Sequence, residues 1–507
     1  MIKKAIYLIL LSTIALFAQI PDLIGELQIM GSERLINLRV IDTLDARMMG
    51  NGVLMVVLPD GTIGAADLVD TLNQDASGLF VNTVYGIRAW RGDISGAFAM
   101  LIGGEADDFG SSAVQTADSN YVIAGVTRSF GVWGTDIIVI KIDRVGNLIW
   151  AKTYGGWDYE GYVSDEQNGA IVLATSDGGL AVTTVTMSWG AGRRDYMLMK
   201  LDTEGDLEWA RVAGGYERDG VRSVIEMYDG GFMLAGWTFS YPPDAENSLL
   251  MRYSADGDLV WARTIGSVGR DKAQSVIEVS GGSIVTGWTQ GYDSFSDFWV
   301  TRLSGAGYPL WSRSIGSDTA DYAFSATPVV DGGVVIEGWT AGFGAGDADF
   351  MTVKLNSIGE FEWAKTLGGT FEEKGYDVIN TLDGGFTITG HSVSYDGSIL
   401  AHLDTEGIME WARAIPDMSV YRISSFLNTI DHGYLLAASS DGYGSPDRDV
   451  FIVKLAADGN TCVGTSIHPV TTSVTPHCVP IDVTTELVYP TVFDVIPTIR
   501  EINPNIV

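Results

Sequence analysis

A motif centred on tryptophan recurs along the middle of the chain with a nearly constant period. The tryptophans follow one another at spacings of 59, 52, 50, 52 and 48 residues, and each has a glycine four residues before it. They are Trp150, Trp209, Trp261, Trp311, Trp363 and Trp411. A period near 50 residues indicates stacked supersecondary units, each of which buries its hydrophobic face against its neighbours.

Other positions extend and subdivide this pattern. Phe98 stands 52 residues before Trp150 in the same context, and Gly459 fills the glycine position of a seventh unit. Between the tryptophans lies a second marker, mostly Asp-Gly-Gly, which is typical of a tight hairpin because glycine tolerates a positive φ. These markers begin at Asp118, Asp177, Asp229, Ser280, Asp331, Asp383 and Asp431.

Each unit therefore contains four short strands, and in the third unit we expect them at residues 221–226, 232–238, 248–253 and 259–265. Four antiparallel strands per unit, repeated radially, predict an all-β, seven-bladed β-propeller over residues 91–463. One strand of the tryptophan type, at about 96–102, precedes all the others. It should complete the last blade and close the ring, which removes a free sheet edge.

The units share longer motifs: Trp363-Ala-Lys-Thr-Leu-Gly-Gly369, Gly338-Trp-Thr340, the Asp383-Gly-Gly turn, and Phe350-Met-Thr-Val-Lys-Leu-Asn356 followed by Gly359. With these motifs the chain resembles the SBBP-type repeat, a family of secreted bacterial seven-bladed β-propellers. It is more distantly similar to quinoprotein-type propeller repeats. The resemblance covers about residues 96–463 and implies export and a propeller, but no particular activity.

The N-terminal segment predicts export. Lys3 and Lys4 precede an apolar stretch at residues 5–17, which is shorter than the roughly 20 residues that span a bilayer, so residues 1–18 are interpreted as a signal peptide. An uncleaved anchor is the alternative. No later segment predicts a membrane span, and we expect a secreted, extracellular or cell-surface protein, or a periplasmic one. Residues 19–90 alternate apolar and polar side chains and predict a small β-rich region.

The C-terminal segment has a different composition. Residues 464–507 are rich in Pro, Thr and Val and predict a tail, either an extended linker or an edge segment, because proline cannot donate to a sheet ladder. Cys462 and Cys478 are the only cysteines, and in an exported chain we expect them to form a disulfide.

The net charge limits the partners of this chain. With 31 Lys and Arg against 64 Asp and Glu, the net charge is −33. Nucleic-acid phosphates require clustered cations, so this charge argues against a nucleic-acid partner and against adsorption to anionic lipid.

Connections on one face of the predicted propeller vary in length, which makes that face the candidate for binding a glycan or protein ligand. An aromatic residue follows the end of each second strand there and could stack on sugar rings. Alternatively, these rings pack beneath their own loops. The residues are Phe130, Trp189, Tyr241, Tyr292, Phe343, Tyr395 and Tyr443.

Carboxylates open the innermost strand of most units and should surround the mouth of the central channel. They could hold Ca²⁺, which prefers oxygen ligands, or they accept N–H bonds from adjacent loops. These residues are Asp108, Asp219, Asp271, Asp321 and Glu373. In the second unit, which carries an insertion near residues 162–167, the equivalent is Glu160 or Glu166; the seventh unit has Tyr421.

No constellation of residues predicts catalysis. The chain has five histidines, and neither a nucleophile elbow nor a zinc-protease motif occurs. The leading hypothesis is an exported, non-enzymatic binding module. No cofactor is assigned, and Ca²⁺ is the one ion that the carboxylates could hold. The alternatives are a polysaccharide hydrolase or lyase that uses channel-mouth carboxylates, and a structural envelope component.

Overall fold

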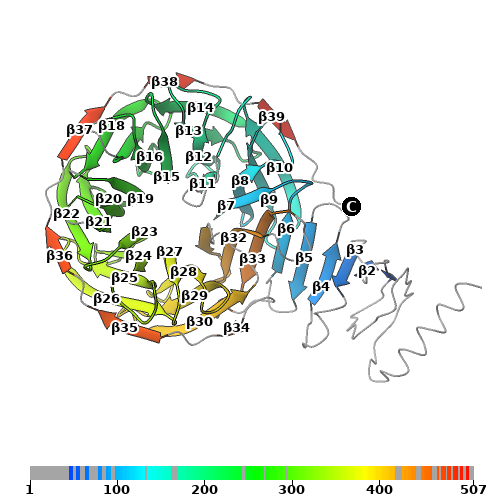
Figure 1. The fold of residues 1–507 in the computed structure, drawn as a ribbon. Coiled ribbons are helices and arrows are strands. Elements are labelled where there is room, and N and C mark those ends of the chain that lie inside the picture. The colour runs from blue at the N-terminus through cyan, green and yellow to red at the C-terminus, as the bar shows by residue number, and fades with distance from the viewer. Residues whose placement is uncertain are drawn as a thin grey trace, which may run out of the picture.

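The computed structural model describes residues 98–459, with gaps at 132–133, 162–168, 242–245, 268, 292–294, 417–424 and 441–446, together with eleven flanking strands. Seven antiparallel sheets stand around a central opening (Figure 1), which confirms the predicted all-β, seven-bladed propeller. No helix among the described residues is long and apolar enough to cross a membrane.

Each blade contributes four strands, numbered here from the central opening outwards. The innermost strands are β7 (Asp108–Gln115), β11 (Ile171–Ala174), β15 (Asp219–Glu226), β19 (Asp271–Val279), β23 (Asp321–Pro328), β27 (Glu373–Asn380) and β31 (Ser425–Asn428). The second strands are β8 (Tyr121–Thr127), β12 (Leu180–Thr186), β16 (Phe232–Thr238), β20 (Gly282–Thr289), β24 (Val334–Thr340), β28 (Phe386–Ser392) and β32 (Tyr434–Ser440). The third strands are β9 (Asp136–Ile142), β13 (Asp195–Leu201), β17 (Asn247–Tyr253), β21 (Asp297–Ser304), β25 (Asp349–Leu355), β29 (Gly397–Leu403) and β33 (Asp449–Leu455). The fourth strands are β10 (Leu148–Gly155), β14 (Leu207–Gly214), β18 (Leu259–Gly266), β22 (Pro309–Gly316), β26 (Phe361–Gly368), β30 (Met409–Pro416) and β6 (Phe98–Ile102).

The hydrophobic core lies between blades rather than within one layer. Seven clusters of buried side chains occur among the described residues, and each joins two neighbouring blades. Both faces of the second strands are covered in this way; every residue of β16, for example, is buried. Strands covered on both faces have continuous apolar sequences instead of alternating ones, which explains runs such as residues 232–235.

The ring closes through the N-terminal strand, as predicted. β6 pairs with β33, with Ile102 opposite Val450 and Phe98 opposite Lys454. The seventh blade therefore combines three strands from the end of the repeats with one from their beginning. Blade 7 also continues outwards through β5 (Ile87–Gly92) and β4 (Gly78–Asn82).

The C-terminal segment forms a belt around the propeller. Its strands pair antiparallel with the fourth strands of blades 6, 5, 4, 3, 2 and 1, in that order, so the belt runs back around the ring (red arrows in Figure 1). The belt strands are β34 (Thr465–Ser466), β35 (Val470–Val474), β36 (His477–Pro480), β37 (Thr484–Val488), β38 (Thr491–Asp494) and β39 (Thr498–Glu501). Pro480 is the last residue of β36, opposite Arg313 of β22.

Several predicted features lie outside the described residues. These include the signal peptide at 1–18 and Cys462 of the expected disulfide. Within residues 19–90 the structure describes β4, β5 and a separate three-stranded sheet. That sheet consists of β1 (Asp45–Met48), β2 (Val53–Val57) and β3 (Ile63–Asp67).

The recurring tryptophan packs against the recurring glycine at the joints between adjacent blades. Each tryptophan on a fourth strand lies against the glycine of the turn that follows the third strand of the next blade. Trp261 lies against Gly307, where a Cβ atom would come within 2.8 Å of the indole. The six tryptophan–glycine contacts explain why both residues recur with the same period.

Replacing Gly307 with alanine should therefore destabilise the propeller more than replacing Gly281, another glycine of blade 4. Both have positive φ, +77° and +81°, but a Cβ on Gly281 would meet nothing within 4 Å. We expect Gly281→Ala to cost about 1 kcal/mol of unfolding free energy and Gly307→Ala about 1–3 kcal/mol more because of overpacking. Urea denaturation measures both. Equal losses of unfolding free energy in the two variants would show that the tryptophan–glycine contact does not stabilise the joint.

Candidate functional site

The two faces of the propeller differ in their exposed hydrophobic side chains. We call the face with the connections from strand two to three and from strand four to the next blade the loop face, and the opposite face the turn face. Among the described residues, the loop face exposes Trp157, Tyr159, Tyr216, Phe239, Phe295, Phe371 and Val393. The turn face exposes Val145, Tyr228, Tyr308, Val330, Ile358, Leu382, Ile408 and Ile430. Exposed aromatic rings thus concentrate on the loop face, which makes it the candidate binding surface.

The aromatic column predicted for ligand binding lies half-buried beneath the loops. Phe130, Trp189, Tyr241, Phe343 and Tyr395 each pack against the core cluster of their own blade joint. The Tyr241 hydroxyl also donates to the Gly214 carbonyl at 3.0 Å. Tyr292 and Tyr443 lie outside the described residues. These contacts hold the five aromatic rings beneath their own loops.

The predicted carboxylate column lies at the start of the innermost strands, on the loop face. Each of its five members is at most 1% exposed, and each accepts the backbone N–H of the residue four positions earlier at 2.5–2.8 Å. They are Asp108, Asp219, Asp271, Asp321 and Glu373. In blade 2 Glu160 occupies this place and accepts the Gly156 N–H at 3.1 Å. Glu166 lies outside the described residues. The calcium site expected for this column stays a prediction.

A second carboxylate faces this column at several joints, and the sequence analysis missed it. Asp195 opens the third strand of blade 2, and a Cβ on Gly214 would lie 1.8 Å from Asp195 Oδ1 and 2.7 Å from Asp219 Oδ2. Asp297 and Asp321 flank Gly316 in the same way. The sequence does contain a pattern that marks these second carboxylates, because the third strand of five blades begins with an aspartate.

Burial and this proximity change the protonation of the paired carboxyls. Burial, with the charge of Asp219 as a smaller cause, raises the pKa of Asp195 to about 7. Burial likewise raises the pKa of Glu160 to about 7 and that of Asp321 to about 6, with Asp136 and Asp297 adding to the effect. A group of acids that looks strongly anionic in the sequence is therefore partly protonated near neutral pH.

An arc of stacked side chains follows the inner rim of the loop face from blade 3 to blade 6. It consists of Trp237, Lys272, Trp288, Tyr322, Trp339 and Lys374. Lys272 Nζ lies 5.2 Å from the centroid of Trp237 and 5.4 Å from that of Trp288. The Tyr322 ring contacts Trp288 edge-on at 5.4 Å and stacks on Trp339 at 4.7 Å. Lys374 Nζ lies 4.9 Å from the centroid of Trp339.

The arc is built by two positions of each blade that face each other across the inner strand pair. The second residue of the innermost strand is paired with the penultimate residue of the second strand: Lys272 with Trp288, Tyr322 with Trp339, and Lys374 with His391. Residues directly opposite each other on antiparallel strands project to the same face of the sheet, so both side chains meet those of the next blade.

The aromatic residues of the arc do not recur in every blade. At the position of Trp237, Trp288 and Trp339, the second strands of blades 1, 2 and 7 carry Val126, Val185 and Ser439. Three consecutive units have Gly-Trp-Thr, which marks the arc in the sequence, but the same motif is also part of the repeat that defines the fold. Tyr322, Trp339, Lys374 and His391 are half-buried, whereas Trp237, Lys272 and Trp288 are buried beneath the rim.

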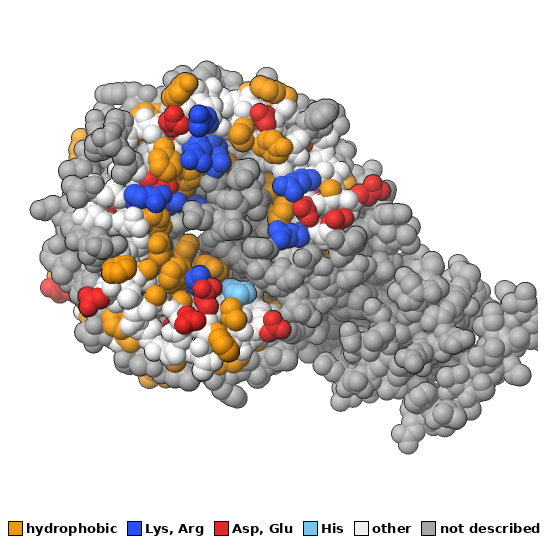
Figure 2. Space-filling view, viewed as in Figure 1, with side chains coloured by type: hydrophobic (Ala, Val, Ile, Leu, Met, Phe, Trp, Pro, Cys, Tyr) orange, Lys and Arg blue, Asp and Glu red, His pale blue; other side chains and the backbone are white. Residues whose placement is uncertain are grey.

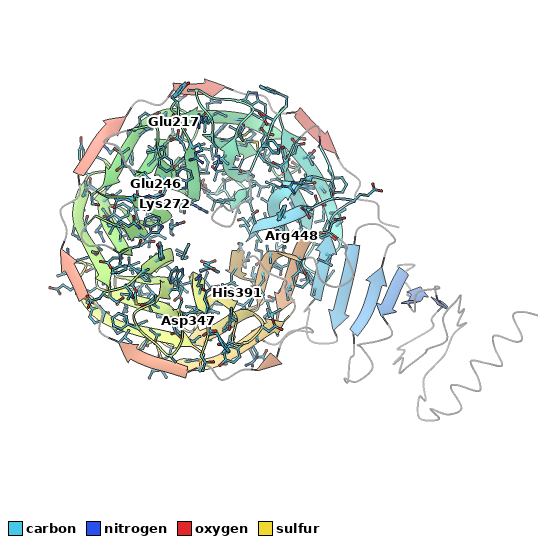
Figure 3. All side chains as sticks on the ribbon, viewed as in Figure 1. Glu217, Glu246, Lys272, Asp347, His391 and Arg448 are labelled. Carbon is cyan, nitrogen blue, oxygen red and sulfur yellow. The ribbon has the colours of Figure 1, made fainter. Side chains whose placement is uncertain are left out.

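Charged groups hold the arc in place. The buried Glu246 carboxylate contacts Lys272 Nζ at 2.9 Å and the guanidinium of Arg270 at 2.6 Å, so Lys272 is fixed between the two indoles. Lys374 pairs with Glu372 at 3.0 Å. Figure 3 shows Glu246 and Lys272 side by side at the opening, with His391 and Arg448 elsewhere around it. In the same view, hydrophobic and Lys or Arg side chains gather at the opening (Figure 2).

Comparison with known proteins assigns no family. No family profile and no curated protein matches the sequence. Among solved structures, the chain is similar to Chaetomium thermophilum Sqt1 (10% identity, 66% of this chain and 80% of that chain, TM-score 0.37). It is also similar to the periplasmic gluconolactonase PpgL of Pseudomonas aeruginosa (12% identity, 73% and 99%, TM-score 0.38). Both TM-scores are below 0.5, so neither similarity carries an argument about function.

Proposed function

We propose that this protein is an exported, non-enzymatic binding module that holds a glycan at the loop-face mouth of the propeller. The observation that supports this proposal is the arc around Tyr322 and Trp339. Aromatic rings offer flat apolar surfaces to the C–H faces of sugars, and nearby polar groups such as Lys374 and His391 can bond to hydroxyl or carboxylate oxygens.

The asymmetry of the arc favours ligand binding over a role in folding. Valine or serine at the same position suffices in three other blades, so the architecture does not demand these rings. The loop face also carries Tyr216 and Phe371, which are 78% and 56% exposed. Large exposed aromatic side chains cost solubility, and their concentration on one face is typical of an interaction surface.

The predicted carboxylate column is a poor fit to the alternative of a hydrolase or lyase. General acid–base catalysis needs carboxyls that reach the substrate. The five side chains at residues 108, 219, 271, 321 and 373 are at most 1% exposed and bonded to their own loops. Export and membership of the SBBP-type repeat family are also part of this proposal and rest on the sequence.

Alanine at Trp339 should weaken glycan binding by roughly tenfold to a hundredfold, because a stacked ring contributes about 1–3 kcal/mol. We would screen the full chain against neutral and uronate-containing polysaccharides by affinity electrophoresis, and then measure dissociation constants by tryptophan fluorescence. Tyr228→Ala is the matched control, since Tyr228 is 88% exposed on the turn face and should not change binding.

Each alternative predicts a different result in the same experiments. Depolymerisation of a polysaccharide would support the hydrolase or lyase, and concentration-dependent self-association in sedimentation would support the structural envelope component. If a polysaccharide binds and Trp339→Ala and Tyr228→Ala bind it equally well, the arc is not the binding site. If no polysaccharide in the panel binds, the glycan proposal fails.

A further inference from the structure

A lysine on the third strand is held between two carboxylates in blades 2 and 5. In blade 2, Lys200 Nζ lies 2.9 Å from the hairpin residue Asp177 and 3.2 Å from Glu208 on the fourth strand. In blade 5, Lys354 Nζ lies 2.9 Å from both Asp331 and Glu362. The position between these two carboxylates on the turn face is therefore built for a positive charge.

Blade 6 keeps both carboxylates but has a histidine in place of the lysine. His402 is opposite Trp411 in the strand register, as Lys200 is opposite Trp209 and Lys354 is opposite Trp363. His402 Nε2 lies 3.0 Å from Asp383 Oδ2 and 3.6 Å from Glu410 Oε2. The three side chains can thus offer ligand atoms within 4.8 Å of one another.

The imidazole is oriented by groups behind it. His402 is 3% exposed, and its ring stacks on Trp411 with the centroids 5.5 Å apart and the planes 15° apart. His402 Nδ1 lies 3.1 Å from Thr387 Oγ1, whose hydroxyl can donate to the Tyr434 oxygen at 3.2 Å. A hydroxyl that accepts from Nδ1–H leaves the Nε2 lone pair directed at the two carboxylates. Metal-ligating histidines characteristically donate their other ring N–H to an oxygen acceptor, and here the hydroxyl of Thr387 can take that place.

We propose that Asp383, His402 and Glu410 form a binding site for one divalent transition-metal ion, with Zn²⁺ as the best match. Imidazole nitrogen combined with carboxylate oxygen suits zinc better than calcium. Ligand arms of about 2.0–2.1 Å in a tetrahedron place donor atoms about 3.3 Å apart, close to the 3.0 and 3.6 Å found here. The carboxylates are 59% and 57% exposed, so an ion and a fourth, solvent ligand have access.

Such an ion would connect three segments of blade 6. Asp383 lies in the first hairpin, His402 on the third strand and Glu410 on the fourth. The unfolded chain does not bring these residues together, so the ion should bind the folded state preferentially and stabilise it. The site lies on the turn face and is independent of the glycan site proposed above.

The decisive variant is His402→Lys, which gives blade 6 the residue of blades 2 and 5. We would dialyse the full chain against EDTA and then titrate ZnCl₂ by calorimetry, with thermal melts in parallel. We expect one ion per wild-type chain and, at a hundredfold excess over Kd, a melting temperature raised by about 3 °C or more. His402→Lys should melt at or above the metal-free wild type and lose this binding event.

Two further variants distinguish the site from adventitious binding. Glu410→Gln should weaken Zn²⁺ binding at least tenfold, whereas Glu362→Gln, the equivalent change in blade 5, should leave it unchanged. His432→Gln, which removes an exposed histidine of blade 7, should leave it unchanged too. The proposal is overturned if the wild-type chain binds no Zn²⁺, or if folded His402→Lys binds it with the wild-type affinity and stoichiometry.

Discussion

A chain that ends at residue 463 should melt roughly 10 °C or more below the full chain and aggregate on heating. This truncation removes all six belt strands, so the fourth strands of blades 1 to 6 would each expose an unpaired backbone edge. Each lost hydrogen bond costs about 1 kcal/mol net, offset in part by the chain entropy that the belt no longer loses. Bare sheet edges also pair with other molecules, which explains the expected aggregation.

A graded series of truncations tests this mechanism. A chain that ends at residue 495 loses only β39 from blade 1, and one that ends at residue 475 loses β36 to β39. Melting temperatures should fall in that order, while a chain that ends at residue 503 keeps every belt strand and should match the full chain. Equal melting temperatures for chains that end at residues 463 and 503 would show that the belt contributes nothing to stability.

The free energy of unfolding should increase as the pH falls from about 8 to about 5. The pKa values of Asp195 and Glu160 are raised to about 7 in the folded protein and that of Asp321 to about 6. The folded state therefore holds protons that the unfolded state releases above pH 4. This stabilisation is complete near the unfolded pKa and is lost as the pH rises through 6 and 7. Between pH 8 and pH 5 each group contributes on the order of 1–3 kcal/mol, least for Asp321.

Other carboxylates reverse the trend in stronger acid. Lys200 and hydrogen bonds from its own turn lower the pKa of Asp177 to about 2 although burial opposes them, so its contribution is lost only as the pH falls below about 4. We would follow urea unfolding at pH 5, 6.5 and 8. Asp195→Asn should flatten the change between pH 5 and 8, and Asp177→Asn should not. A wild-type stability that is constant or increases from pH 5 to 8 would contradict the paired-carboxyl interpretation.

The propeller could be predicted because its information is local and repeated. Asp-Gly-Gly hairpins and the glycine before each tryptophan mark turns at fixed intervals, and seven copies of a four-stranded unit in register predict a propeller. The position of Phe98 ahead of the first complete unit was enough to predict that β6 pairs with β33. The site was harder to predict, because deviations from a repeat, such as Trp237 or His402, have meaning only once their neighbours in space are known.

The amino-acid sequence alone established the blade number, the hairpins, the closing strand and the face that carries variable loops, since turn chemistry and hydrophobic periodicity act between residues close in the chain. Only the tertiary structure determined the course of the belt, the pairing of Asp195 with Asp219, the stacking of Lys272 between Trp237 and Trp288, and the meeting of Asp383, His402 and Glu410. The belt pairs through backbone groups, which are the same for every residue and identify no partner. The side-chain clusters join neighbouring blades or separate strands of one blade, and such contacts exist only after the ring has closed.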